Sequence, residues 1–160
     1  MTLERIHLPL SLLLLLLLLS LLLQPGSSQI STCCRETRVQ RFWRLHVDNP
    51  KSFMPGGVRQ YCTAMIQRRQ ISDRGNCKHE NTFIHAVAGA ILDVCKSPRI
   101  KPCRVKTKKC HLSDHVFRQT LCILQGLGYF PNCTYMGFLK FKKITLACAG
   151  NPEVPVYLDP

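Results

Sequence analysis

The first 28 residues differ from the rest of the chain in their pattern of apolar positions. Glu4 and Arg5 precede an almost unbroken run of leucine over residues 8–23, and a small, polar segment ending at Ser28 follows. This order is typical of a secretory signal peptide that is cleaved after Ser28. The alternative is a signal anchor that stays in the membrane, but the run of about 16 apolar residues is shorter than the ~20 that a spanning helix needs.

Two segments of the remaining chain show the spacing of amphipathic helices. Apolar residues recur at i, i+3, i+4, i+7 and i+8 in Val39, Phe42, Trp43, His46 and Val47. This helix is predicted to end at residues 48–50, which include a proline, and its spacing places His46 on the inward face. A loop at residues 51–57 precedes a second helix with the same spacing in Val58, Tyr61, Cys62, Met65 and Ile66.

Strands are predicted mainly in the second half of the chain. After a strand at residues 81–85, a third short helix is expected at 86–96, with Ala88, Ile91, Leu92 and Cys95 inward. Stretches rich in β-branched, aromatic and aliphatic residues then follow at 116–124, 132–138, 139–149 and 154–158, separated by glycine and proline turns. Helices first and strands afterwards predict an α+β fold with antiparallel pairing.

Removal of residues 1–28 leaves 132 residues, which is the size of one domain. We assign residues 29–39 to an N-terminal arm and residues 40–160 to the domain itself. All ten cysteines lie in this part, and without C-x-x-C pairs they indicate disulfides rather than a metal site. A bond between adjacent Cys33 and Cys34 would be strained. These two therefore either pair with another chain, as in a disulfide dimer, or remain reactive.

The chain is strongly basic. It carries 22 lysines and arginines against nine aspartates and glutamates, a formal net charge of +13 at pH 7. Such a charge favours RNA, other polyanions or an anionic membrane surface as partners, although charge also serves solubility. One basic cluster comprises Arg104, Lys106, Lys108 and Lys109; in a second, Lys140 and Lys142 share one strand face and Lys143 lies opposite.

Cys77-Lys78-His79-Glu80-Asn81-Thr82-Phe83 places a lysine beside a cysteine, where a disulfide would hold its charge in place. This heptapeptide resembles the C-K-x-x-N-T-F signature of the pancreatic ribonuclease family. The segment from Phe42 to Asp48 resembles the family's F-x-R-Q-H-x-D helix with one departure, and the ending from Val154 to Asp159 resembles its V-P-V-H-F-D. Three further phrases look most like the family's ribonuclease 4 branch: Gln40-Arg41-Phe42, Ile66-Gln67-Arg68-Arg69 and Gly150-Asn151-Pro152.

The resemblance implies a ribonuclease A-like fold with three short N-terminal helices, a bent antiparallel sheet and four disulfides. Eight cysteines allow many pairings, and the resemblance implies Cys62 with Cys122, Cys77 with Cys133, Cys95 with Cys148, and Cys103 with Cys110.

Family members cleave RNA on the 3′ side of pyrimidines through a cyclic phosphate. The resemblance implies that His46 takes the proton of the 2′-hydroxyl, that Lys78 stabilises the charge growing on phosphate, and that Thr82 binds the pyrimidine edge. Arg41 and Arg104 stand at positions that contact outlying phosphates in the family.

Two residues depart from the catalytic pattern, and a third matches it but lacks the histidine that it would orient. Tyr157 stands where the family has its second catalytic histidine, the general acid. A phenol titrates near pH 10, against about 6.5 for imidazole, and does not easily cycle its proton at neutral pH. Leu45 replaces a phosphate-binding glutamine and cannot donate a hydrogen bond. Asp159 matches the aspartate that orients the replaced histidine.

Other histidines offer no clear replacement for that acid. His85 is interpreted as a structural, hydrogen-bonded residue, and His111 and His115 as surface residues. Asn132-Cys133-Thr134 is a glycosylation sequon, but its central residue is expected in a disulfide, which leaves glycosylation of Asn132 open.

Three functional hypotheses follow. The first is a secreted, extracellular protein that binds RNA or other polyanions, with pyrimidine-directed cleavage impaired or lost, and that acts in host defence. The second is an active but slow pyrimidine-preferring endoribonuclease. The third is a membrane-disrupting antimicrobial protein. Whether the protein is an enzyme stays open, leaning to no, and neither a cofactor nor a metal is expected.

Overall fold

The structure is a computed structural model that describes residues 9, 11, 12, 14, 36–105 and 109–160. Met1–Cys34 and Arg35–Pro160 are separate units, and only the second is considered further. The predicted signal peptide boundary, most of the arm, Cys33, Cys34, Lys106 and Lys108 lie outside the described residues. No helix within the described part of the chain is long and apolar enough to cross a membrane.

Three helices form within residues 36–96: α2 Arg38–His46, α3 Gly57–Arg68 and α4 Ala88–Val94. At the start of α2 the Gln40 amide donates to Thr37 Oγ1 at 3.1 Å, and the Thr37 amide donates to Gln40 Oε1 at 2.9 Å. This capping box satisfies amides that have no partner within the helix. The first two predicted helices are confirmed.

The prediction for the third helix was too long and partly wrong about its faces. Val87 is extended and begins the helix rather than lying inside it, and the helix ends before Cys95. Ala88 is exposed, whereas Val94 is buried. A helix of only two turns has too few residues for its spacing to identify one face with certainty.

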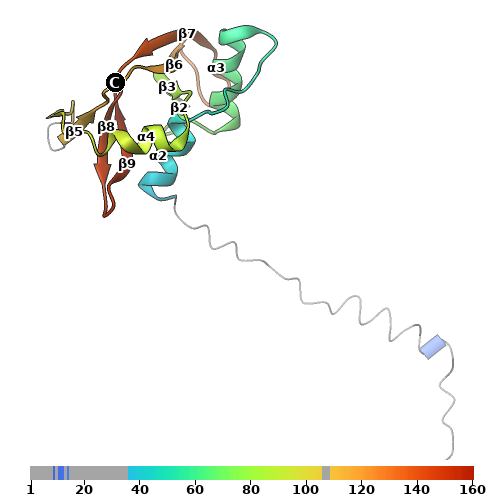
Figure 1. The fold of residues 1–160 in the computed structure, drawn as a ribbon. Coiled ribbons are helices and arrows are strands. Elements are labelled where there is room, and N and C mark those ends of the chain that lie inside the picture. Colours follow the sequence, from blue (N-terminus) through green and yellow to red (C-terminus); the bar gives the residue numbers. More distant parts are fainter. Residues whose placement is uncertain (1–8, 10, 13, 15–35, 106–108) are drawn as a thin grey trace, which may run out of the picture. The chain divides into compact units, whose positions relative to one another are not determined.

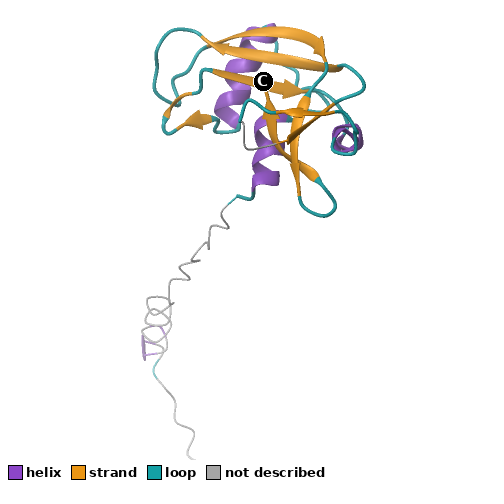
Figure 2. Ribbon diagram, turned by 90° about the vertical axis from the view of Figure 1, so that its left-hand side faces the viewer, coloured by secondary structure: helices purple, strands orange, loops and turns teal. Residues whose placement is uncertain are grey.

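The strands are short and pair antiparallel throughout the described residues (Figures 1 and 2). Their bounds are β1 Ser72–Asp73, β2 Asn76–Cys77, β3 Glu80–Ile84, β4 Ile100–Pro102, β5 Lys109–Leu112, β6 Phe117–Leu124, β7 Tyr135–Lys142, β8 Thr145–Ala149 and β9 Val154–Asp159. One sheet has the order β3-β6-β7, a second has the order β4-β5-β8-β9, and β1 pairs with β2. The α+β class is therefore confirmed.

The predicted break between residues 138 and 139 was wrong. β7 continues to pair with β6 until Lys142 lies opposite Phe117. The chain then turns, and at Ile144 it exchanges backbone and side-chain hydrogen bonds with Ser113 before entering the second sheet. This change of partner strand, rather than a change in residue type, ends β7. The strands β1, β2, β4 and β5 were not predicted, because two to four residues carry no recognisable alternation.

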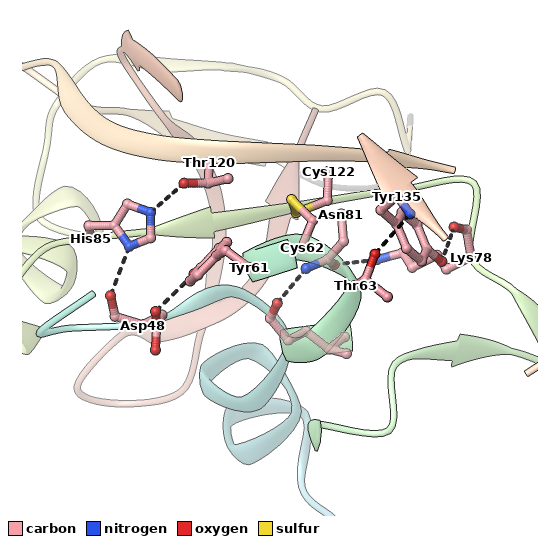
Figure 3. The surroundings of a disulfide bond; sticks show 11 residues. Asp48, Tyr61, Cys62, Thr63, Lys78, Asn81, His85, Thr120, Cys122 and Tyr135 are labelled. Carbon is pink, nitrogen blue, oxygen red and sulfur yellow. Dashed lines mark hydrogen bonds between the residues drawn. A yellow bond between two sulfur atoms is a disulfide. The ribbon is translucent and has the colours of Figure 1, made fainter. Parts of the chain in front are cut away.

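Four disulfides connect the elements in the pairing that the resemblance implied. Cys62–Cys122 lies in the core between α3 and β6 (Figure 3). Cys77–Cys133 fixes the end of β2, immediately before Lys78. A domain of this size buries a limited apolar core, and disulfides of this kind typically contribute about 2–4 kcal/mol each.

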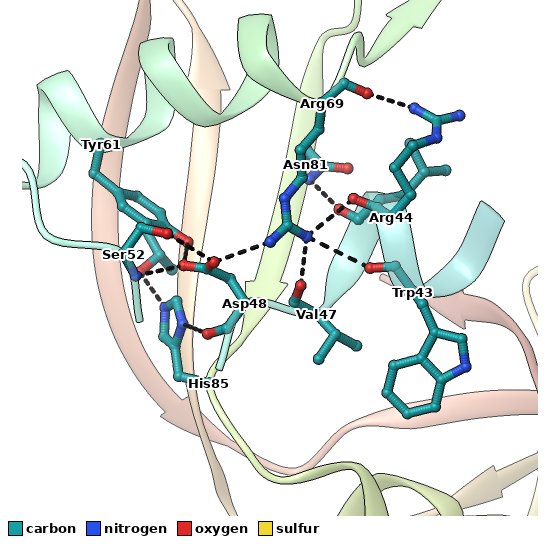
Figure 4. Close-up of polar contacts among 11 residues, drawn as sticks. Trp43, Arg44, Val47, Asp48, Ser52, Tyr61, Arg69, Asn81 and His85 are labelled. Atoms are coloured by element: carbon teal, nitrogen blue, oxygen red, sulfur yellow. Dashed lines mark hydrogen bonds and ion pairs between the residues drawn. The ribbon is translucent and has the colours of Figure 1, made fainter. Parts of the chain in front are cut away.

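A buried carboxylate joins the end of α2 to both ends of α3 (Figure 4). Asp48 is only 4% exposed. Its oxygens accept hydrogen bonds from the Tyr61 hydroxyl at 2.8 Å, from Arg69 Nη2 at 2.9 Å, and from both the amide and hydroxyl of Ser52. Arg69 also donates to the carbonyl of Val47. The carboxylate is thus paired and fully hydrogen-bonded, which is what makes a buried charge tolerable.

His85 is attached to the same network. Its Nδ1 lies 2.9 Å from the carbonyl oxygen of Asp48, and its Nε2 lies 2.7 Å from Thr120 Oγ1. Burial lowers the pKa of His85. Both ring nitrogens are occupied within the fold, in agreement with the predicted structural role.

Replacement of Arg69 by methionine is expected to destabilise the protein by about 3 kcal/mol, because the Asp48 carboxylate would stay buried without its cation. The matched control is Arg68→Met, which changes the neighbouring but exposed arginine of the same helix. Chemical denaturation of both variants measures the difference. Equal loss of unfolding free energy in the two would contradict this account of Asp48.

Candidate functional site

His46 is the last residue of α2, and its side chain faces β3. The Nδ1 atom lies 2.9 Å from the carbonyl oxygen of Thr82. Because a carbonyl oxygen only accepts, Nδ1 carries the hydrogen and Nε2 holds the free lone pair. The inward position predicted from helical spacing is confirmed, and the hydrogen bond fixes the tautomer that a general base requires.

The surroundings of His46 disfavour its charged form. Burial lowers its pKa to about 4, with a further contribution from the ammonium of Lys78, and the hydrogen bond to Thr82 offsets only part of this. The imidazole is therefore neutral at pH 7 and can accept a proton. An anion bound beside it would stabilise the imidazolium and raise the pKa again.

Lys78 is held from two directions (Figure 3). Its ammonium donates to Asn81 Oδ1 at 2.9 Å, and Asn81 Nδ2 in turn donates to the carbonyl oxygen of Leu45 at 2.8 Å. Its own carbonyl oxygen accepts from the Tyr135 hydroxyl at 2.7 Å. The cation is thereby linked through Asn81 to the final turn of the helix that carries His46.

The charge of Lys78 is poorly compensated. Burial lowers its pKa, and the positive charge of Arg41 lowers it further, while Glu80 and Asp73 act in the opposite direction. Two cations that disfavour each other next to a neutral imidazole form a place where an anion such as phosphate is stabilised. Arg41 is exposed on α2 and acts electrostatically on Lys78, and its contact with an outlying phosphate stays a prediction.

Thr82, whose carbonyl oxygen accepts the hydrogen bond from His46, lines a cavity of about 180 Å³. Leu158, Asp159 and Thr145 line it from β8 and β9. Three lysines also line it: Lys101 from β4, and the consecutive Lys142 and Lys143 from the end of β7 and the turn that follows. The sequence placed Lys143 away from Lys142 and did not single out Lys101.

The Asp159 carboxylate is bonded to the backbone of a distant segment. The carboxylate is 8% exposed, and its Oδ1 accepts a hydrogen bond from the amide of Arg104 at 2.8 Å. Tyr157 lies opposite Ala147 in β9 and packs on the cluster formed by Cys103, Cys110 and Ala147. Asp159 thus fixes the beginning of the 103–110 segment, a structural role that its position in the sequence did not reveal.

Leu45 behaves as a hydrophobic residue. Its side chain packs against the core cluster around Cys62, Ile66 and Phe83. It offers a phosphate group no hydrogen bond from its side chain. Leucine therefore fits the fold here but leaves the phosphate site with one donor fewer.

His111 corrects a prediction. Its side chain is only 13% exposed, with Nδ1 2.8 Å from the carbonyl oxygen of Ser97 and Nε2 3.4 Å from a Glu153 oxygen. It was expected at the surface, but β5 lies between β4 and β8 inside the sheet, which covers it. Asn132 is exposed beside the half-cystine Cys133, and its glycosylation stays a prediction. No cluster of metal-binding side chains occurs among the described residues.

The family model for pancreatic ribonuclease matches residues 37–159. The chain belongs to the pancreatic ribonuclease family. It is 38% identical to ribonuclease 4 of Bos taurus and 37% identical to ribonuclease 4 of Homo sapiens, each over 99% of both chains. The crystal structure of green turtle egg white ribonuclease superposes with a TM-score of 0.65 at 38% identity, covering 78% of this chain and 98% of that one.

Membership of the pancreatic ribonuclease family confirms two predictions. The fold is ribonuclease A-like, with its helices, antiparallel sheets and four disulfides. The likeness to ribonuclease 4 seen in short phrases extends over nearly the whole chain. The structure brings Lys78 near His46 and Arg41 near Lys78, and it places Thr82 and Asp159 in the lining of one cavity.

The Lys78→Gln variant is expected to raise the pKa of His46 from about 4, because the repulsion from the Lys78 ammonium disappears while burial remains. Saturating inorganic phosphate is expected to raise it in the wild-type protein as well. Proton NMR titration of the imidazole measures both effects. Lys96→Gln, an exposed lysine paired with Asp93, serves as the control and should leave the midpoint unchanged. If the titration midpoint of His46 changes neither in Lys78→Gln nor with added phosphate, the anion site is contradicted.

Proposed function

We propose that this protein is a secreted, basic pancreatic-type ribonuclease homologue that binds RNA and other polyanions, and whose cleavage of pyrimidine-containing RNA is impaired or lost. The observation that carries the proposal is that two of the three catalytic positions keep a suitable residue and the third does not. His46 and Lys78 are positioned as a base and a cation, whereas Tyr157 occupies the position of the acid. Such a protein would act on extracellular RNA, in host defence.

RNA cleavage through a cyclic phosphate needs three catalytic groups: a general base, a cation beside the phosphate and a general acid. His46 Nε2 carries a lone pair and can take the proton of the 2′-hydroxyl. Lys78, oriented by Asn81, can stabilise the negative charge that grows on the phosphate oxygens. The departing 5′ oxygen then needs a proton, and a phenol releases one poorly near neutral pH. The base and the cation are therefore available, and the acid is weak.

Two further features support a loss of catalysis rather than a relocated acid. The Asp159 carboxylate, whose family role is to orient the second histidine, is engaged by the Arg104 amide. Leu45 contributes packing where a phosphate donor would stand. Asp159 thus keeps a structural use without a histidine at position 157, and Leu45 supplies no hydrogen bond to a phosphate.

Binding of polyanions is supported by the distribution of charge around the same site. Arg41 adds its charge to that of Lys78, and three lysines line the cavity beside Thr82. The chain has a formal net charge of +13. Contacts of lysine and arginine with phosphates supply affinity that depends little on sequence and falls as salt rises.

A slow, pyrimidine-preferring endoribonuclease is the second candidate. The fixed tautomer of His46 and the anchored Lys78 favour it, because neither arrangement is needed for packing alone. In this reading the phenol of Tyr157, or water, donates the proton slowly. The two candidates differ in whether residual cleavage depends on the protein's own His46.

Restoring the acid decides between them. Tyr157→His is expected to raise cleavage of polyuridylate by about 10²–10⁴, and Tyr157→Phe to leave it unchanged. Initial rates on purified, refolded protein lacking residues 1–28 provide the measurement. Wild-type turnover equal to that of Tyr157→His would refute impairment. A large loss in Tyr157→Phe would instead make the phenol the acid and support the slow enzyme, provided that His46→Ala also abolishes cleavage.

Arg41 is expected to contribute one phosphate contact. For a single-stranded oligouridylate, the plot of log affinity against log salt should become shallower by about 0.7 in Arg41→Gln. Arg59→Gln, an exposed arginine on α3, is the matched control and should keep the wild-type slope. If the wild type, Arg41→Gln and Arg59→Gln all give the same salt slope, Arg41 does not contact the bound phosphates.

A further inference from the structure

The sheet formed by β3, β6 and β7 has two unlike faces. Asn81, Cys122 and Gly137 lie opposite one another in register on the face that α3 covers. At Gly137 this face has no room for a side chain, because a Cβ there would come within 2.4 Å of a Val58 methyl. Because side chains alternate along a strand, Thr82 and its neighbours in register must point to the other face.

The row that begins at Thr82 continues through Leu121 of β6 to Phe138 of β7. Thr82 and Leu121 are half-buried, and Phe138 is 43% exposed. Neighbouring strands are about 4.8 Å apart, so Phe138 stands roughly 10 Å from Thr82 across the sheet. β7 is an edge strand within the described part of the chain (Figure 1). An aromatic ring thus lies open two strands away from Thr82, in the same cross-strand row.

Charge is unevenly distributed along this surface. Lys140 and Lys142 follow Phe138 on the same face of β7, and Lys142 lines the Thr82 cavity. At the other end, Glu80 lies in the row of Ile123 and Met136. A polyanion that passes over Phe138 is therefore attracted toward the lysine end and repelled at the glutamate end.

These features suit single-stranded RNA. Its bases stack on open aromatic rings while its phosphates contact lysines, and this combination recurs in proteins that bind single strands. A second copy of the chain is a poor partner for this surface, because its own Lys140 and Lys142 would repel the same lysines of the first copy. The surface also continues directly from the cavity at which Thr82 would hold a base.

We propose that Thr82, Leu121, Phe138 and Lys140 form an extended RNA subsite, here called the β7 shelf, on which Phe138 stacks against a nucleotide next to the one held at Thr82. The inference rests on the proposed RNA-binding function and specifies where the strand runs. It assigns binding, rather than chemistry, to β7.

The test compares two phenylalanines of the same strand. Phe138→Ala removes the ring from the shelf, whereas Phe141→Ala removes a more exposed ring, at 64%, from the opposite face. The probe is 2′-O-methyl hexauridylate, which lacks the hydroxyl that cleavage requires, and affinity is followed by fluorescence anisotropy. Phe138→Ala should weaken binding about fivefold or more, and Phe141→Ala less than about twofold.

Further measurements keep the outcomes distinct. Affinity for 3′-uridylate alone should stay unchanged in both variants, since one nucleotide does not reach the shelf, and thermal unfolding confirms that both fold. If Phe138→Ala binds hexauridylate as tightly as the wild type, or if Phe141→Ala weakens binding equally, the β7 shelf is refuted. The proposed RNA binding is then unaffected. A wild-type protein that fails to bind the probe at low salt overturns the proposed RNA binding as well. Equal loss of binding to phosphatidylserine vesicles in both variants, with RNA affinity intact, would make β7 a membrane contact and refute the shelf.

Discussion

The attachment of the α2 C-terminus to strand β3 is the constraint on which the site depends. The His46 ring donates to the carbonyl of Thr82, and the Asn81 amide donates to the carbonyl of Leu45. Both bonds use residues of the same two elements, so the helix cannot rotate without breaking them together. The Asp48 network closes the junction from behind by holding the chain that leaves α2. The side chains that meet a substrate therefore stand on backbone that is fixed at several points.

This attachment also sets the electrostatics. The helix end buries His46 and brings it near Lys78, and both effects lower the pKa of the imidazole. The neighbouring Arg41 lowers the pKa of Lys78 in turn. A phosphate group beside these side chains would offset the repulsion between their positive charges. Anion binding and protonation of His46 are coupled in this arrangement, because each favours the other.

The same scaffold separates binding from cleavage. Anchoring of Lys78 by Asn81 and placement of Thr82 at a cavity do not depend on the residue at position 157. Asp159 accepts a hydrogen bond from the Arg104 amide, so the carboxylate has a structural use although the histidine that it would orient is replaced by Tyr157. Under the proposed function the fold keeps a polyanion site although its proton donor has changed. Family membership alone does not establish activity.

Local pattern determined the first two helices, the inward position of His46 and the α+β class, because helical spacing and alternation depend only on neighbours in the chain. The resemblance carried by Cys77-Lys78 through Phe83 supplied the roles and the disulfide pairing. Only the tertiary structure decided that Lys101, Lys142 and Lys143 meet at Thr82, that Asp159 holds Arg104, that β7 extends to Lys142, and that His111 is covered. These features arise where strands distant in sequence pair, and the register of such pairing is set by packing of the whole domain rather than by any one segment.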